Sequence, residues 1–271
     1  MTRRLRVLFY IGSMHAGGAE RQVVEMLRHL NRERFEPMLA LASREGSLLS
    51  EVPADVPLLA FADPDTGRQP WSRWGVGFLR RSRWLSRLLR TQRCDVVYDR
   101  TYLATLDTAW ACWSRGVPRI SAAVADPRVQ FEMYARRLPA LRRRYGKWTY
   151  HTAAKVLANS AGLQQQMIDY WQLPPEQVLV QPNGLDFERI EQRSREQTIP
   201  KNPGEIRLLT VGRIDEDKGH IDLLNALEEL VRRRGHRELK WQILGVGPCM
   251  ETLRQEVAAK GLTSHVEFVG A

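Results

Sequence analysis

The sequence predicts an α/β protein with two doubly wound parallel sheets, each covered by helices. Short apolar runs rich in β-branched residues alternate with helical patterns along the first two-thirds of the chain, as expected for βαβ units in a mostly parallel sheet. A polar stretch with Pro and Gly, residues 191–205, then interrupts the pattern, and the same alternation restarts after it. A chain of 271 residues is long enough to form two such domains.

The first predicted domain, residues 1–190, begins with the apolar run "RVLFYI". This run and the six that follow have the length and β-branched content of buried strands. Helical patterns separate most of them, and the clearest cover residues 18–31 and 72–93. The predicted strands are residues 6–11, 37–43, 56–61, 95–99, 119–125, 155–160 and 178–183.

The second predicted domain, residues 206–271, follows the predicted interdomain linker at 191–205. Its pattern consists of the strand "IRLLTVG", a helix at 218–234, the strand "KWQILGV", a helix at 250–260 and the strand "VEFVG". Sheets average about five to six strands. The sequence therefore predicts an incomplete second domain.

The net charge of +10 is unevenly distributed. No acid lies between Asp65 and Asp95, a window with eight arginines, and none lies between Glu132 and Asp169, a window with seven Arg and Lys residues. Localised positive charge favours phosphate-rich partners, such as anionic lipid headgroups or polyphosphate substrates. The three cysteines are widely spaced and form no CxxC motif, which favours a reducing, cytosolic setting. No apolar run approaches the ~20 residues that span a bilayer.

Ligands of open α/β sheets bind beyond the carboxyl ends of the strands, where helix N-termini offer free N–H groups. The turn after the first strand, "GSMHAGGAERQ", contains Gly17 and Gly18. These glycines leave room for a ligand near the start of a helix. They are equally consistent with a flexible turn that binds nothing, and they lack the spacing of a dinucleotide-binding motif.

The turn "VGRIDEDKGH" follows the first strand of the second domain. Arg213 can donate a bidentate pair of hydrogen bonds to a phosphate, Lys218 adds a point charge, and Gly219 allows close backbone approach. Alternatively, Arg213 pairs with Asp215 or Glu216 while Asp217 caps the following helix. The local chemistry leaves both interpretations open.

Six stretches occur in order along the chain: "GGAERQVVEML", "VLANS", "VQPNGLDFERI", "VGRIDEDKGHIDLLNAL", "QILGVGPCMETLR" and "VEFVG". In this order and approximate spacing they resemble the family 4 retaining glycosyltransferases of GT-B fold. The resemblance implies two Rossmann-like domains that face each other across a cleft. The acceptor would bind mainly to the first domain and the nucleotide-sugar donor mainly to the second.

The resemblance also implies roles for particular residues. Arg213 and Lys218 match the cations that hold the donor diphosphate, and Gly17 and Gly18 match the loop that faces it. The loop near the domain junction is matched by Asn183 and Gly184, although Asn-Gly is also an ordinary turn sequence.

The sequence departs from the family pattern at two places. Where the family commonly has an acceptor-side histidine, this chain has Ala125 and Asp126. Asp126 is expected either to make a polar contact or to start the turn at Pro127. The family's Glu-x7-Glu segment, which contacts the donor sugar, is expected downstream of Ala271. The chain is therefore expected to be a fragment or a shortened protein.

Residues 72–93, taken as a helix, place arginines on one face and leucines roughly opposite. One interpretation is attachment to an anionic membrane, with Trp84, Trp71 and Trp74 near the interface. The other is a helix packed on the sheet with a solvated arginine face. The stripe consists of Arg80, Arg83, Arg87 and Arg90.

The leading hypothesis is an enzyme that moves a sugar from a nucleotide-diphosphate sugar to a glycan or lipid-linked acceptor in cell-envelope polysaccharide or glycoconjugate synthesis. The alternatives are a GT-B-fold nucleotide-sugar epimerase and a non-catalytic basic module that binds membrane or nucleic acid. No cofactor or metal is expected if the two cations serve the diphosphate. No nucleic-acid partner is expected, since the sequence contains no helix-turn-helix, RNP or zinc motif. The expected location is cytoplasmic, with peripheral attachment to the inner face of the cell membrane if the arginine stripe binds lipid.

Overall fold

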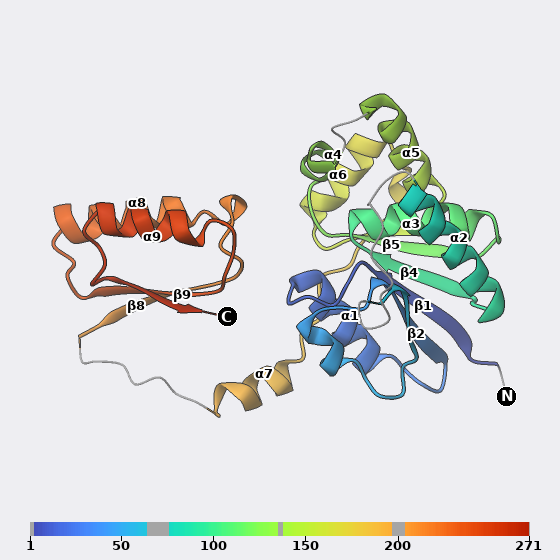
Figure 1. Ribbon diagram of the computed structural model, residues 1–271, viewed down its shortest axis with the longest axis horizontal. Helices are drawn as coiled ribbons and strands as arrows, with labels where there is room; N and C mark the ends of the chain where they lie inside the picture. The colour runs from blue at the N-terminus through green and yellow to red at the C-terminus, as the bar shows by residue number, and fades with distance from the viewer. Residues whose placement is uncertain (1–2, 64–75, 135–137, 197–203, 271) are drawn as a thin grey trace. The chain divides into compact units, whose positions relative to one another are not determined.

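The computed structural model describes residues 3–63, 76–134, 138–196 and 204–270 (Figure 1). The chain divides into two compact units, Met1–Glu188 and Arg189–Ala271. Each unit contains one parallel sheet with helices packed on it (Figure 1). The predicted α/β class with two parallel sheets is confirmed.

The first unit contains a seven-stranded sheet in the order β3-β2-β1-β4-β5-β6-β7, and every neighbouring pair is parallel. All seven strands lie where the apolar runs predicted them, with ends that differ by a few residues. Several predicted strands were too long at their carboxyl ends, where the chain leaves the sheet to form loops. The strands are β1 (Leu5–Ile11), β2 (Phe35–Ser43), β3 (Leu58–Ala62), β4 (Val96–Arg100), β5 (Arg119–Ala123), β6 (Lys155–Ala158) and β7 (Val178–Val180).

Helices cover both faces of this sheet. α1 packs on one face through Val23, Val24 and Leu27, together with the apolar side chains of β1 and β2. α2 and α3 pack on the opposite face, and Trp171 of α6 lies in the core formed with α3, α4 and α5. The helices of this unit are α1 (Gly18–His29), η1 (Ser47–Glu51), α2 (Val76–Thr91), α3 (Tyr102–Trp113), α4 (Pro127–Tyr134), α5 (Pro139–His151), α6 (Ala161–Trp171) and η3 (Pro175–Gln177); α7 (Phe187–Ser194) begins at its end.

Buried polar groups fix α3 against the sheet. The fully buried carboxylate of Asp99 on β4 accepts hydrogen bonds from Thr105 (2.6 Å) and Thr108 (2.7 Å) on α3 and lies 3.4 Å from the guanidinium of Arg119 on β5. Because these groups are buried, their geometry must satisfy every partner at once. The sequence of α3 supplies hydroxyls on the face that meets this carboxylate.

A second buried group involves Asp107, also on α3. Its carboxylate lies 2.8 Å from Nε of Arg81 and accepts a hydrogen bond of 2.9 Å from the hydroxyl of Tyr10. Burial raises the pKa of Asp107, and the contact with Arg81 opposes that shift. Arg81 is therefore a buried, paired charge and contributes nothing to the exposed stripe on α2.

The second unit contains a three-stranded parallel sheet in the order β10-β9-β8. The core is formed by side chains such as Leu224, Trp241 and Leu253, and α8 and α9 lie on the same face of the sheet (Figure 1). The helix predicted at 218–234 is a short η4 turn followed by α8 and a π-helical segment. The elements are β8 (Ile206–Val211), η4 (Glu216–Lys218), α8 (His220–Glu228), η5 (Glu229–Arg233), β9 (Leu239–Leu244), α9 (Met250–Ala259) and β10 (Val266–Gly270).

The stretch predicted as an interdomain linker is partly helical. Residues 191–194 form the last turn of α7, and residues 197–203 lie outside the described residues. The polar composition of this stretch is consistent with α7, which has no buried side chain. The apolar residues of α7, Phe187 and Ile190, lie three residues apart and are exposed, so they share one face of a helix that is not packed on either sheet.

Candidate functional site

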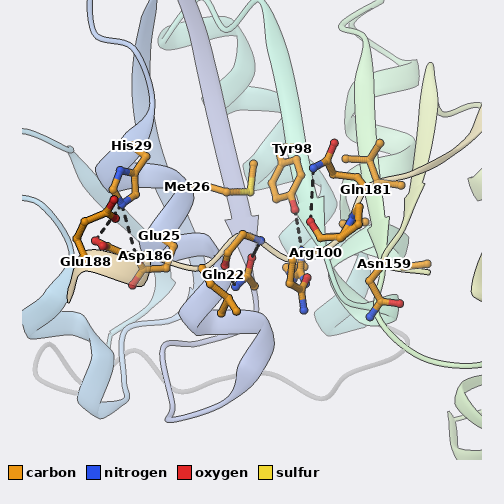
Figure 2. A pocket seen from close by; sticks show the side chains of 17 residues that line it. Gln22, Glu25, Met26, His29, Tyr98, Arg100, Asn159, Gln181, Asp186 and Glu188 are labelled. Atoms are coloured by element: carbon orange, nitrogen blue, oxygen red, sulfur yellow. Dashed lines mark hydrogen bonds and ion pairs between the residues drawn. The ribbon is translucent and has the colours of Figure 1, made fainter. Parts of the chain in front are cut away.

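A pocket of about 550 Å³ lies in the first unit, between α1 and the carboxyl ends of β4 to β7 (Figure 2). This edge of a parallel sheet is where ligands of open α/β folds bind. Figure 2 shows Arg100, Asn159 and Gln181 toward one end of the pocket, and Glu25, His29, Asp186 and Glu188 toward the other. The walls between them include Gln22, Met26, Tyr98, Ala122, Leu157 and Asn183.

Arg100, the last residue of β4, is 6% exposed and lines this pocket. Its guanidinium donates hydrogen bonds to the hydroxyl of Tyr98 (3.1 Å) and to Oδ1 of Asn183 (2.7 Å). Burial raises the pKa of Tyr98, and the charge of Arg100 opposes that shift. The next residue, Thr101, has φ 84° and ψ 149°, a conformation that residues with a Cβ atom rarely adopt and that clusters at functional sites.

Gln22 of α1 forms two hydrogen bonds with the loop after β7. The amide of Gln22 donates a hydrogen bond of 2.7 Å to the carbonyl of Gly184 and accepts one of 2.9 Å from its N–H. A Cβ atom at Gly184 would contact nothing within 4 Å, so internal packing of this unit does not require glycine there. Asn183 and Gly184, both predicted as cleft residues, thus lie at the pocket wall, and Asn183 binds Arg100.

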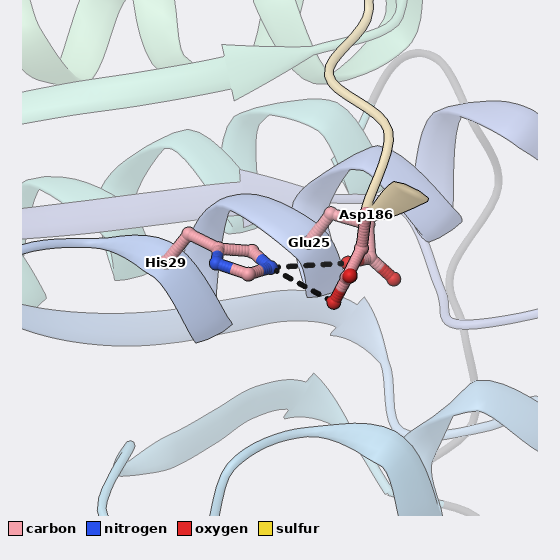
Figure 3. Close-up of side chains that lie close together, drawn as sticks. All are labelled: Glu25, His29 and Asp186. Carbon is pink, nitrogen blue, oxygen red and sulfur yellow. Dashed lines mark hydrogen bonds and ion pairs between the residues drawn. The ribbon is translucent and has the colours of Figure 1, made fainter. Parts of the chain in front are cut away.

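The opposite end of the pocket contains a cluster of Glu25 and His29 on α1 with Asp186 from the loop before α7 (Figure 3). Nε2 of His29 lies 3.3 Å from Oδ2 of Asp186 and 3.7 Å from Oε2 of Glu25. The three candidate ligand atoms lie within 4.8 Å of one another, close enough for a cation to contact all of them. The expectation that no metal is needed remains a prediction.

Gly17 and Gly18, predicted to face the donor, lie at the start of α1. Gly17 is the N-cap and has an extended backbone, while a Cβ atom at Gly18 would contact nothing within 4 Å. Neither backbone conformation nor packing within the unit therefore requires glycine at position 18. A Cβ atom at Gly17 would lie 2.3 Å from Oε2 of Glu20, so the carboxylate of Glu20 lies over the start of α1 and Gly17 leaves room for it.

In the second unit, Arg213 and Lys218 lie in the turn between β8 and α8, as predicted. Their side chains are 66% and 49% exposed, respectively. Arg213 pairs with Asp215 at 2.5 Å and Lys218 pairs with Asp217 at 3.1 Å. The predicted cap at Asp217 is wrong: Asp215 accepts a hydrogen bond from the N–H of Glu216 and begins η4.

Gly219 follows these cations as the N-cap of α8, with φ 67°. This left-handed conformation favours glycine, so the turn needs Gly219 for its backbone. Gly245 and Gly247, in the turn after β9, allow that turn to pack closely on the turn after β8. A Cβ atom on Gly245 would lie 1.9 Å from the carbonyl oxygen of Gly212, and one on Gly247 would lie 2.1 Å from that of Ile214. The "GVGP" sequence therefore packs the turn after β9 directly on the backbone beside Arg213.

Asp126 does not line the pocket described above. Its Oδ1 accepts a hydrogen bond of 2.7 Å from the N–H of Arg128, and its carbonyl accepts one from Gln130. Asp126 thus starts the turn into α4, which is one of the two roles expected for it. Its carboxylate satisfies a free N–H group at the start of that helix.

The arginine stripe predicted on α2 is exposed at all four positions. Trp84 differs from the expectation, because its half-buried ring packs on Phe61 at 5.8 Å and against the core under α2. Trp71 and Trp74 lie outside the described residues. Beside the stripe, Leu79, Arg83 and Trp110 line a shallow hollow with little polar surface. Within the described parts of the chain, no helix is both long enough and apolar enough to cross a membrane.

Several residues of the pocket were not predicted from the sequence. Arg100 could have been found, because it directly follows the apolar run "DVVY" and the carboxyl ends of parallel strands are the ligand-binding edge. Glu25 and His29 are four residues apart and share a helix face, but nothing local indicated that Asp186 would meet them. Gln22 carries no sequence signal for its contact with a residue 162 positions away.

Two family models match the chain in succession. The model described as Glycosyltransferase Family 4 matches residues 16–189, and the model described as Glycosyl transferases group 1 matches residues 191–271. A curated Campylobacter jejuni protein, N-acetylgalactosamine-N,N'-diacetylbacillosaminyl-diphospho-undecaprenol 4-alpha-N-acetylgalactosaminyltransferase, is 28% identical over 121 residues. That match covers 45% of this chain and 31% of the relative's length.

Solved structures resemble the chain over nearly its full length. Anabaena Alr3699/HepE in complex with UDP and glucose superposes with a TM-score of 0.72 at 19% identity, over 98% of this chain and 69% of that one. UDP-N-acetylglucosamine 2-epimerase from Rickettsia bellii superposes with a TM-score of 0.63 at 11% identity, over 98% and 69%. Because a protein crystallised with UDP and glucose and a nucleotide-sugar epimerase both match at low identity, these likenesses establish the GT-B fold alone.

Proposed function

The chain belongs to glycosyltransferase family 4, and from that premise we propose that it transfers a sugar from a nucleotide-diphosphate sugar to a glycan or lipid-linked acceptor. The order of the two family models along the chain supports an acceptor unit followed by a donor unit. The name of the Campylobacter relative, which places its acceptor on diphospho-undecaprenol, supports a lipid-linked acceptor. Cell-envelope glycoconjugate synthesis is the setting that fits such an acceptor.

The observation that carries the proposal is the pair of exposed cations in the turn after β8. Arg213 and Lys218 both precede α8, whose N-terminal N–H groups also favour an anion. Each cation pairs with a neighbouring acid at the surface, and such pairs contribute only about 0–1 kcal/mol. A diphosphate can therefore displace Asp215 and Asp217 at little cost. As the sugar leaves, charge grows on the diphosphate oxygens and these cations stabilise it.

Isothermal titration with UDP, GDP and ADP tests this donor site. Arg213→Ala and Lys218→Ala each remove a charge-assisted contact, so we expect affinity for the preferred nucleotide to fall roughly tenfold to hundredfold. Arg233→Ala is the matched control, because Arg233 is an exposed arginine of the same unit paired with Glu229 at 2.9 Å. Wild-type affinity in Arg213→Ala would reject the donor assignment.

The reaction itself is tested by incubating the chain with the preferred nucleotide sugar, with and without a lipid-linked oligosaccharide. Transfer predicts release of nucleoside diphosphate that depends on the acceptor. An epimerase would instead convert the nucleotide sugar to its epimer without any acceptor, and that product would replace the proposal.

The arginine stripe on α2 is the surface we assign to the membrane, at the cytoplasmic face of the cell membrane. Arginines near an anionic bilayer each contribute about 1 kcal/mol of attraction. Leu79 and Trp110, next to Arg83, add apolar and aromatic side chains of the kind that enter the interfacial region. Attachment there would bring the first unit to a lipid-linked acceptor.

Co-sedimentation with vesicles containing phosphatidylglycerol tests this surface. Replacing Arg83, Arg87 and Arg90 by Gln should weaken binding roughly a hundredfold, from about 1 kcal/mol for each arginine. Replacing the exposed Arg232, Arg233 and Arg234 by Gln changes the net charge equally in the other unit and serves as the control. Equal loss in both triple variants would show that net charge, and no particular face, drives binding.

A further inference from the structure

Arg100 differs from the other buried arginines in its partners. Among the described residues, Arg81, Arg100 and Arg119 are buried arginines. Arg81 pairs with Asp107 at 2.8 Å, and Arg119 lies 3.4 Å from Asp99. No carboxylate of the described residues forms an ion pair with Arg100, whose two hydrogen-bond partners, Tyr98 and Asn183, are neutral. A buried cation without an anion is costly unless something else neutralises it.

The hydrogen-bonding capacity of Arg100 is also incompletely used. A guanidinium has five N–H donors, and two of them are used in the described contacts. Its Nε is buried and has no hydrogen-bond partner in the part of the chain that the structure describes. Burial raises the pKa of the Glu20 carboxyl, and a backbone hydrogen bond, His15 and Arg100 oppose that shift. Within the described contacts, Glu20 neither forms an ion pair nor shares a hydrogen bond with Arg100, whose partners are Tyr98 and Asn183.

The position of Arg100 provides space for the missing anion. Arg100 lines the pocket of about 550 Å³, and the amides of Asn159 and Gln181 line the same end (Figure 2). Amide N–H groups and a guanidinium together suit the oxygens of a phosphate or carboxylate. At the other end, the carboxylates of Glu25 and Asp186 are acceptors for sugar hydroxyls. One end of the pocket thus offers hydrogen-bond donors and a positive charge, and the other end offers carboxylate acceptors.

We propose that Arg100 binds an oxyanion of the acceptor, so that the acceptor is an anionic glycan or glycosyl phosphate with its hydroxyls toward Glu25 and Asp186. The identification of this ligand as the acceptor rests on the proposed transferase function. The binding of an oxyanion at Arg100 rests on the pocket alone. Asn183, which holds Arg100 through a 2.7 Å hydrogen bond, fixes the guanidinium and is a positioning residue.

Titration of the wild-type chain with glucose 1-phosphate, glucuronic acid and glucose tests the proposal. At least one of the anionic sugars should bind more tightly than glucose, and the tighter of the two identifies phosphate or carboxylate as the preferred group. Arg100→Gln should weaken that binding roughly tenfold to hundredfold. Arg115→Gln should leave it unchanged, because Arg115 is an exposed arginine whose Nε donates to Ser86 on the opposite side of the sheet.

Two further measurements separate binding from structure and acceptor from donor. Arg100→Gln should melt at the same or a higher temperature than wild type, because it removes an uncompensated buried charge. It should also bind nucleoside diphosphates like the wild type, whereas Arg213→Ala should retain binding of the anionic sugar. The proposal is overturned if neither anionic sugar binds better than glucose, or if Arg100→Gln binds them as the wild type does. Loss of nucleoside diphosphate binding in Arg100→Gln would reassign the oxyanion to the donor.

Discussion

Thr101 lies between β4 and α3 in a backbone conformation, φ 84° and ψ 149°, that is nearly exclusive to glycine. A residue with a Cβ atom there stores about 1–3 kcal/mol of strain. Removing the Cβ atom with Thr101→Gly releases that strain but increases the entropy of the unfolded chain, which costs about 0.5–1 kcal/mol. We therefore expect Thr101→Gly to raise the free energy of unfolding by up to about 2.5 kcal/mol.

Thr101→Ala is the matched control, because it removes the hydroxyl and keeps the Cβ atom. Urea unfolding of both variants, followed by circular dichroism, measures the difference. The surrounding structure holds the strain in place: the Thr101 carbonyl accepts from Thr105, and Tyr102 is buried against Trp171. If the free energy of unfolding of Thr101→Gly does not exceed that of Thr101→Ala, the backbone at Thr101 stores no strain, and the turn after Arg100 is not a strained one.

The remaining predictions concern the two ion pairs of one glutamate and the close packing of one glycine. Glu51 accepts from Arg21 (2.6 Å) and Arg28 (2.9 Å), and these contacts lower its pKa from 4.5 to about 2. A carboxyl whose pKa is lower in the folded than in the unfolded protein stabilises the fold at every pH above its unfolded pKa. Glu51→Gln should therefore cost about 1 kcal/mol at pH 7. In unfolding curves, the difference between variant and wild type should vanish as the pH falls from 4.5 to about 2. Gly247→Ala should cost about 1–3 kcal/mol by overpacking and weaken nucleoside diphosphate binding, since its Cβ atom would lie 2.1 Å from the Ile214 carbonyl oxygen. Gly162→Ala, where a Cβ atom meets nothing within 4 Å, should be neutral or stabilising in thermal melts; equal destabilisation in both alanine variants would contradict the packing argument.

The strands of the first unit were predictable because buried parallel strands are continuous apolar runs bounded by polar loops. The segment around residues 134–148 was harder, because its many arginines obscure the helix α5. Only its burial pattern, with Gly146 and Tyr150 buried, identifies the inner face. A Cβ atom on Gly146 would lie 2.7 Å from the Trp171 ring, a contact between segments that no local pattern shows.

The candidate site was predictable where a motif is contiguous and hidden where it is assembled from distant segments. Arg213 and Lys218 share one turn, so their proximity follows from the sequence. Arg81 and Arg100 look alike in sequence, since both are arginines in basic or apolar surroundings. Arg81 pairs with the buried carboxylate of Asp107, 26 residues away, whereas Arg100 lines a pocket. Which of these occurs depends on packing between elements, and a single sequence does not encode that directly.

The buried contacts of Asp99 and Arg119 constrain how this sequence can change over evolutionary time. Loss of either residue alone leaves a charge in the interior, at a cost of about 3–5 kcal/mol, whereas replacing both by apolar residues of similar volume is often neutral. A sequence that replaces only one of the two residues is therefore destabilised, whereas a sequence that replaces both is not. Among the relatives of this chain, we expect these two positions to be retained together or lost together, and the hydroxyls of Thr105 and Thr108 to disappear only in lineages where the pair is gone.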